Sequence, residues 1–187
     1  MSTIEFIRLA FEAGLLQFGA FAHQNGAHSP YMLNFDLLTS YPAVLRHAAE
    51  AVAMLIEKST VNRLVCTQDS VALATLVSQE LDIPLIVHRG LSGSPAQNLL
   101  GAYDIGHPAS LVTLTTSIQS TRIRALRHDA SSVGVNLNEW VTIVSTGPVT
   151  SFRHRSVFTV QDAAEILAAQ GALTIEMAAM IARASGT

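Results

Sequence analysis

Apolar residues recur along this chain with two different spacings, and the spacing changes from one segment to the next. Behind Ser2 and Glu5, which have the spacing of a capping box, apolar residues recur every three or four positions and predict a first helix. Residues 15–38 alternate loosely around an Asn25-Gly26 pair, which predicts a small β-hairpin. A proline then opens a second helical pattern over 42–58.

From residue 62 onward, short apolar runs alternate with helical patterns. The apolar runs predict strands at 62–66, 83–88, 110–116 and 139–145, and an edge strand within 99–105. The helical patterns cover 70–81, 120–133, 159–169 and 174–185. Strands that alternate with helices predict an α/β fold with a mostly parallel, doubly wound sheet. The chain has no internal repeat and no linker-like segment, so we expect a single domain over 1–187.

Composition narrows the function classes. Of the 187 residues, 49% are hydrophobic and only 13% are charged, which favours additional burial against a partner. A net charge of -3 without a basic block argues against nucleic acid as the main partner, and no apolar run is long enough for a membrane span. The first residues do not resemble a secretory signal, and the single cysteine, Cys66, forms no internal disulfide, so we expect a cytoplasmic protein. Ten of the eleven basic residues are arginines, and Lys58 is the one lysine.

The segment from residue 6 to about residue 52 carries a family resemblance. It contains Phe18-Gly19-Ala20-Phe21, Asn25-Gly26, Ser29-Pro30-Tyr31 and Tyr41-Pro42 in this order. This ordered run resembles the N-terminal part of the orotate phosphoribosyltransferases, and a strand that ends in Arg89 extends the resemblance to roughly the whole chain. The resemblance implies a type I phosphoribosyltransferase-like fold with a five-stranded core under a small N-terminal hood. It also implies a homodimer in which each subunit lends a loop to its neighbour's site. We therefore expect a hood helix and hairpin at 1–40, a core at 41–150 and C-terminal helices at 151–187.

The family's reaction sets the chemical groups that must be present. The enzyme joins a pyrimidine base to C1 of phosphoribosyl pyrophosphate and expels pyrophosphate. This requires Mg²⁺, cations on the leaving group and carboxylates near the ribose hydroxyls. The adjacent acidic pair of the family falls on Thr113 and Leu114, neither of which carries a charge.

The phosphate-binding loop of the family falls on five residues that precede a predicted helix: Ser117, Ile118, Gln119, Ser120 and Thr121. The hydroxyls and the free amides of the helix start could hold a phosphate as a vestigial site. The alternative is that the hydroxyls only cap the helix, because Gln119 replaces the glycine of the family and Ile118 is bulky.

The cations that the family uses are replaced at several further positions. The pyrophosphate-binding turn becomes Thr67, Gln68, Asp69 and Ser70, in which the carboxylate of Asp69 would repel pyrophosphate. Gly90 and Gly93 fall near the lysines of the mobile loop, which leaves His88 and Arg89 as a loop remnant or as a solvated strand end. The hairpin lysine becomes Gln24, and the arginine that would hold orotate's carboxylate falls near Thr146.

The histidines, the cysteine and the remaining arginines provide little further evidence for a functional site. The seven histidines show no metal-ligand spacing, so we predict no metal site, and Mg²⁺ only if the protein is active. Cys66 ends a buried strand and is interpreted as a core thiol. Arg124 and Arg127 share a helix face that either receives an anion or is simply solvated.

Three functional hypotheses follow. The first is a catalytically degenerate pseudoenzyme that acts as a structural or regulatory subunit, as a homodimer or paired with an intact relative. The second is a module that binds phosphate or a nucleotide-like ligand. The third is an active orotate phosphoribosyltransferase-like enzyme in pyrimidine (UMP) biosynthesis, completed by residues from elsewhere. We favour the first, because the resemblance is best in the segment that forms the hood and poorest at the positions of the family's catalytic groups.

Overall fold

The computed structural model describes residues 2–22, 28–90, 93–117, 120–149 and 153–185. A central sheet has the strand order β5-β4-β3-β6-β7-β8. Its strands are β3 (Arg63–Thr67), β4 (Leu85–His88), β5 (Leu99–Leu100), β6 (Pro108–Thr115), β7 (Asn136–Ser145) and β8 (Arg153–Thr159). Five of these strands are parallel, and β5 alone pairs antiparallel, with β4. The expectation of a mostly parallel sheet is thereby confirmed, and the described sheet has six strands where the resemblance implied a five-stranded core.

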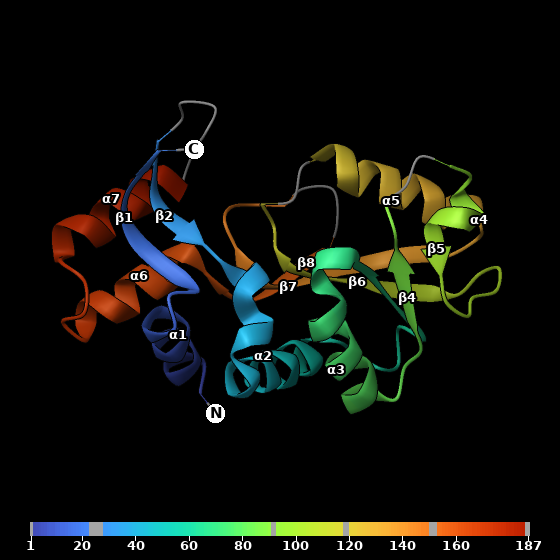
Figure 1. Cartoon of the computed structure of the whole chain (residues 1–187), viewed down its shortest axis with the longest axis horizontal. Coiled ribbons are helices and arrows are strands. Elements are labelled where there is room, and N and C mark those ends of the chain that lie inside the picture. Colours follow the sequence, from blue (N-terminus) through green and yellow to red (C-terminus); the bar gives the residue numbers. More distant parts are fainter. Residues whose placement is uncertain (1, 23–27, 91–92, 118–119, 150–152, 186–187) are drawn as a thin grey trace.

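Helices cover both faces of the sheet (Figure 1). On one face lie α1 (Thr3–Glu12), α2 (Pro42–Leu55), η2 (Gln68–Ser70) and α3 (Val71–Leu81), and on the other lie α4 (Pro95–Asn98) and α5 (Ser120–Ser132). Each face has its own buried apolar cluster, because residues alternate between the faces along each strand. Cys66 and Val112 pack on the α2–α3 side, whereas Val65 and Leu111 pack on the α5 side. No helix within the described residues is long and apolar enough to cross a membrane.

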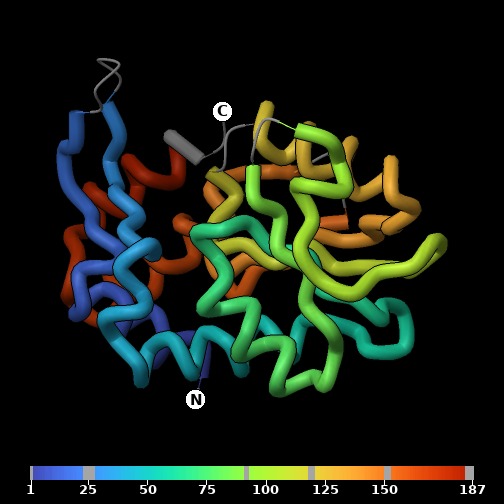
Figure 2. The backbone as a smooth tube through the Cα atoms, turned by 45° about the vertical axis from the view of Figure 1, so that its right-hand side comes forward, coloured from blue at the N-terminus to red at the C-terminus, as the bar shows by residue number. Residues whose placement is uncertain are grey.

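A smaller layer stands beside the sheet and contains the C-terminal end of the described chain (Figure 2). It consists of the hairpin β1 (Leu16–Ala22) and β2 (His28–Leu33), the short η1 (Phe35–Ser40), and the C-terminal helices α6 (Val160–Ala169) and α7 (Ile175–Ser185). The antiparallel pairing of β1 with β2 confirms the predicted hairpin, whose Asn25-Gly26 turn lies outside the described residues. We call this layer the hood.

The expectation that 151–187 holds only helices is wrong, because Arg153–Thr159 forms β8 at one edge of the sheet. Its sequence, RHRSVFT, has no apolar run, and only Phe158 in it is buried. Glu139 on β7 is 2% exposed and forms an ion pair with Arg155 on β8. The strand is therefore held by pairing with β7 and by a buried ion pair, neither of which a hydrophobicity pattern reveals.

Two smaller differences concern the segment after β4. The predicted edge strand in 99–105 is limited to Leu99–Leu100, and the residues before it form the unpredicted short helix α4. A capping box starts this helix, with Ser94 and Gln97 as its two members. The glycine- and proline-rich composition of 89–98 indicated a loop and concealed this single turn.

Candidate functional site

The carboxyl ends of the five parallel strands meet along one edge of the sheet, where open α/β sheets usually bind ligands. The predicted site residues that the structure describes lie at or near this edge. The turn at 67–70 follows β3, His88 ends β4, Ser117 follows β6 and Thr146 follows β7. The topology thus brings together segments that are far apart in the sequence, as the hypothesis of a common site requires.

The turn after β3 is closed by its own side chains. The hydroxyl of Thr67 donates a hydrogen bond to Oδ1 of Asp69, and the Ser70 hydroxyl lies 3.3 Å from the same oxygen. The two hydroxyls are themselves 3.1 Å apart. Both hydroxyls of the predicted pyrophosphate turn are therefore engaged by a carboxylate, and the group that the turn presents to solvent is negative. Gln68 is exposed beside them.

The position of the family's acidic pair is part of the core. Thr113 is fully buried, and its hydroxyl donates to the carbonyl oxygen of Thr115 at 3.0 Å. The same hydroxyl accepts a hydrogen bond of 2.8 Å from the indole Nε1 of Trp140 on the neighbouring strand. Leu114 points to the other face of the sheet, where it is 9% exposed and belongs to the α2–α3 cluster. These residues offer Mg²⁺ no carboxylate, so they do not fit the metal that the fold's transferase reaction uses.

Hydroxyl pairs join the loops after β6 and β7. The hydroxyls of Thr116 and Thr146 lie 3.0 Å apart, and the backbone N–H of Thr146 donates to Thr116 Oγ1 at 2.9 Å. Ser117 pairs in the same way with Thr115 at 2.7 Å. In the predicted phosphate loop, Ile118 and Gln119 lie outside the described residues, α5 starts at Ser120, and Thr121 is exposed. The choice between phosphate binding and simple capping at Ser117–Thr121 stays open.

His88 is neither a solvated strand end nor a free cation. It is 6% exposed, and its Nε2 lies 3.0 Å from Oδ2 of Asp129 on α5. Asn98 donates to the same oxygen at 2.8 Å. Burial alone would raise the pKa of Asp129, but the hydrogen bonds from His88 and Asn98 outweigh it and hold that pKa below its usual value. The prediction of a solvated strand end fails because Asp129, 41 residues away in sequence, supplies a buried partner. Arg89 is exposed.

A cavity of about 250 Å³ lies between the hood and the carboxyl edge. Asn34 and Asp36 line it from the hood side, and Asp69 and Thr115 line it from the sheet. Its two charged lining residues are both acidic, so the cavity disfavours phosphate and pyrophosphate groups.

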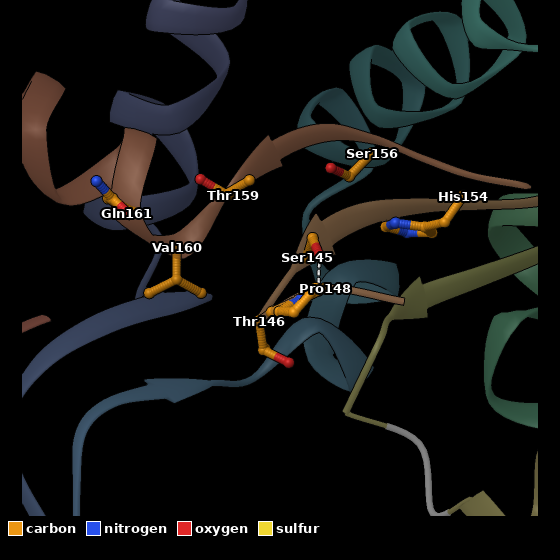
Figure 3. Close-up of a pocket in the computed structure, with 9 residues that line it drawn as sticks. Ser145, Thr146, Pro148, His154, Ser156, Thr159, Val160 and Gln161 are labelled. Atoms are coloured by element: carbon orange, nitrogen blue, oxygen red, sulfur yellow. Dashed lines mark hydrogen bonds between the residues drawn. The ribbon is translucent and has the colours of Figure 1, made fainter. Parts of the chain in front are cut away.

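A second cavity, of about 340 Å³, lies at the carboxyl ends of β7 and β8 (Figure 3). Six polar residues contribute to its lining: Ser145, Thr146, His154, Ser156, Thr159 and Gln161. The His154 ring meets Trp140 edge-on, with 5.6 Å between ring centroids, and its Nε2 lies 3.1 Å from the Thr142 hydroxyl. Burial lowers the pKa of His154, so the imidazole is neutral at neutral pH.

Comparison with known proteins identifies the architecture. No family model matches the sequence. Among solved structures, the UMP synthase of Leishmania donovani superposes with a TM-score of 0.82 at 18% identity over 98% of this chain. The chain spans 42% of the length of that protein. The orotate phosphoribosyltransferase of Francisella tularensis superposes with a TM-score of 0.73 at 18% identity, over 96% of both chains. An adenine phosphoribosyltransferase from Thermoanaerobacter pseudethanolicus gives a TM-score of 0.59 at 9% identity, over 83% of this chain and 99% of that one.

The chain has the type I phosphoribosyltransferase fold. The hood hairpin and the parallel core that the sequence predicted are those of this fold, in the variant found in orotate phosphoribosyltransferase structures.

Several residues at the carboxyl edge of this phosphoribosyltransferase fold were missed or undervalued from sequence. Asp129 was not considered, because a single acidic residue on a predicted helix carries no signal of burial. His154 could not be placed at this edge from sequence, because the strand β8 that carries it was not predicted. Trp140 is only 5% exposed. Its bond to Thr113 joins the positions of the family's acidic pair to the second cavity.

Proposed function

We propose that this protein is a non-catalytic relative of the orotate phosphoribosyltransferases that acts as a structural or regulatory subunit. The observation that carries the proposal is the double hydrogen bonding of Thr113. Where the family has a carboxylate, this chain has a buried hydroxyl that donates to Thr115 and accepts from Trp140. The position is thus part of the packing of the sheet.

Two further observations support the proposal. The hydroxyls of the turn after β3 are bonded to the carboxylate of Asp69, which opposes a pyrophosphate there. His88, next to the loop that carries lysines in the family, is buried and bonded to Asp129. Losing one electrostatic stabiliser costs a transferase about 10²–10³ in rate, and here several positions are changed together. A homodimer, or a heterodimer with an intact relative, would give such a subunit its role.

The test is a pair of assays on the purified chain. We expect no pyrophosphate release from phosphoribosyl pyrophosphate, Mg²⁺ and orotate, and no calorimetric signal when phosphoribosyl pyrophosphate with Mg²⁺ is titrated into the protein. Pyrophosphate release by the chain alone would overturn the proposal. Sedimentation analysis of the same sample reports whether the chain forms a dimer.

An active orotate phosphoribosyltransferase is the second candidate. The superposition of 98% of the chain on a UMP synthase favours it, since the whole transferase architecture is kept. In that case another subunit or a further domain would donate the missing charges. Pyrophosphate release by the mixture that exceeds the release by the intact relative alone would support this candidate against the first.

A further inference from the structure

The cavity at the ends of β7 and β8 differs in charge from the rest of the carboxyl edge. None of its described lining residues is Asp, Glu, Lys or Arg. Its volume of about 340 Å³ is large enough for a single-ring ligand, and it lies at the lower end of the range for small-molecule sites. Its polar groups are hydroxyls, an amide and an imidazole, which recognise a ligand through hydrogen bonds and not through ionic pairs.

Two of these groups are oriented alike and are free to bind. His154 and Ser156 are two residues apart on β8, so their side chains point to the same face of the sheet. Within the described residues, the Ser156 hydroxyl and Nδ1 of His154 form no hydrogen bond. Nε2 of His154 is already used by Thr142, and the ring rests edge-on against Trp140, which fixes its orientation. The site therefore offers a hydroxyl and a ring nitrogen that are held in place before any ligand arrives.

The start of α6, which borders the cavity, does not provide an anion site. Thr159 and Asp162 form a capping box, in which the Asp162 carboxylate accepts the Thr159 backbone N–H at 2.9 Å. A carboxylate of the chain thus already occupies the positive end of this helix. Glu165 adds a second negative charge nearby, bonded to Gln161 at 2.9 Å. An anionic ligand would be repelled here, and Thr146, where the family has an arginine, offers it no compensation.

We propose that this cavity binds an uncharged heterocycle of pyrimidine size that carries both hydrogen-bond donors and acceptors, and that it discriminates against the carboxylate of orotate. The inference rests on the orotate phosphoribosyltransferase kinship of the proposed function, and it changes the ligand class from an anionic to a neutral ring. His154 and Ser156 contact the ring edge, and Thr146 borders the cavity at the position where the family has the arginine for orotate's carboxylate.

Uracil and orotate form a matched pair of probes, because the two rings differ by one carboxylate. We expect calorimetric titration of the full chain to give at least about tenfold tighter binding of uracil than of orotate, a difference that one uncompensated charge readily produces. Equal or tighter binding of orotate would overturn the inference, and so would the absence of uracil binding at millimolar concentration.

Three variants locate the site. Ser156→Ala removes one hydrogen-bonding group and is expected to weaken uracil binding about threefold to tenfold. Ser59→Ala is the matched control, since Ser59 is exposed before β3, at the opposite edge of the sheet, and should leave the affinity unchanged. Thr146→Arg adds a cation and is expected to shift the preference towards orotate about tenfold. Unchanged uracil affinity in Ser156→Ala, or an unchanged preference in a folded Thr146→Arg, would place the ligand elsewhere and overturn the proposal.

The same titrations separate this inference from the proposed function. Pyrophosphate release would overturn the proposed function whatever uracil does. A chain that releases no pyrophosphate and binds no uracil would leave the non-catalytic role standing and remove only the neutral-ligand site.

Discussion

The two ends of the carboxyl edge use polar residues in opposite ways. At the β4–α5 end, which we call the sealed side, His88, Asn98 and Asp129 are buried and bonded to one another. At the β7–β8 end, which we call the open side, polar groups line a cavity, and Ser156 has no bonded partner within the described residues. One edge of one sheet thus holds both a polar cluster that serves stability and a polar lining that is available for binding. The two sides differ in their internal hydrogen bonds and also in charge, because the sealed side contains the Asp129 carboxylate and the described lining of the open side contains no Asp, Glu, Lys or Arg.

The largest expected effect concerns the access of a reagent to Cys66, which is buried on β3 next to the sealed side. Burial, with a smaller contribution from Asp69, raises the pKa of this thiol from 9.0 to about 12. Since the thiolate is the reactive form, we expect alkylation at about pH 8 to be slowed about 10³-fold relative to an unperturbed thiol. Mass spectrometry after iodoacetamide treatment measures this, with the denatured chain as the control. Rapid labelling of the native protein would show that β3 is accessible.

Among single substitutions at this edge, removal of the Asp129 carboxylate should lower the free energy of unfolding the most. Asp129→Ala deprives buried His88 and Asn98 of their shared acceptor, so we expect the free energy of unfolding to fall by about 3 kcal/mol. Urea denaturation measures the change. Asp104→Ala is the control, since Asp104 is exposed, and it should stay within about 0.5 kcal/mol of the parent. Equal losses in the two variants would mean that the sealed side contributes no special stability.

Thr113→Val tests the boundary between the two sides. The substitution keeps the shape of the side chain but removes the acceptor of the Trp140 indole, so we expect a loss of about 1–2 kcal/mol in the free energy of unfolding. The near-ultraviolet circular dichroism of this single tryptophan should change as well. A Thr113→Ser variant keeps the hydroxyl and should retain more of the native signal. If valine and serine behave alike, the hydroxyl is not what holds the position.

The smallest expected effect is a pH dependence of stability, which falls in a different pH range for the open side than for the sealed side. Because burial lowers the pKa of His154 below 6.5, the unfolded chain binds a proton more readily than the folded one, so stability from this residue is full above pH 6.5 and declines below it. The lowered pKa of Asp129 acts at lower pH, since its contribution is present above 3.8 and is lost as pH falls through the folded value. Unfolding of the parent and of His154→Gln from about pH 8 to pH 5 measures the first effect. Parallel curves would contradict it.

Much of the fold was predictable because its signals are local. The N-cap bond from the Glu5 backbone N–H to the Ser2 hydroxyl, the apolar runs of β3 and β6 and the alternation with helices all depend on neighbours in sequence. The strand β8 was not predictable in this way, because its sequence has the polar composition of a loop. Its pairing with β7 and its ion pair to Glu139 stabilise the strand, and both contacts depend on the fold.

The candidate site was predictable only in part. The sequence placed Thr67–Ser70, His88 and Ser117 at or after the ends of predicted strands, and in the structure these strand ends lie at the carboxyl edge of the sheet. It could not predict that Asp129 bonds His88, since that contact spans 41 residues and depends on how α5 packs. The second cavity could not be predicted from the sequence either, because it forms only when β8 brings His154 beside Trp140.

The ion pair between Glu139 and Arg155 has a consequence for the behaviour of the chain in concentrated solution. β8 ends the sheet, so its outer backbone groups could pair with a strand of another molecule and start aggregation. Arg155, whose side chain is 28% exposed, and the exposed Arg153 make the strand a poor template, because a docking strand would have to strip water from these two charges. In a chain with so few charged residues, the placement of two of them here protects the molecule from its own copies.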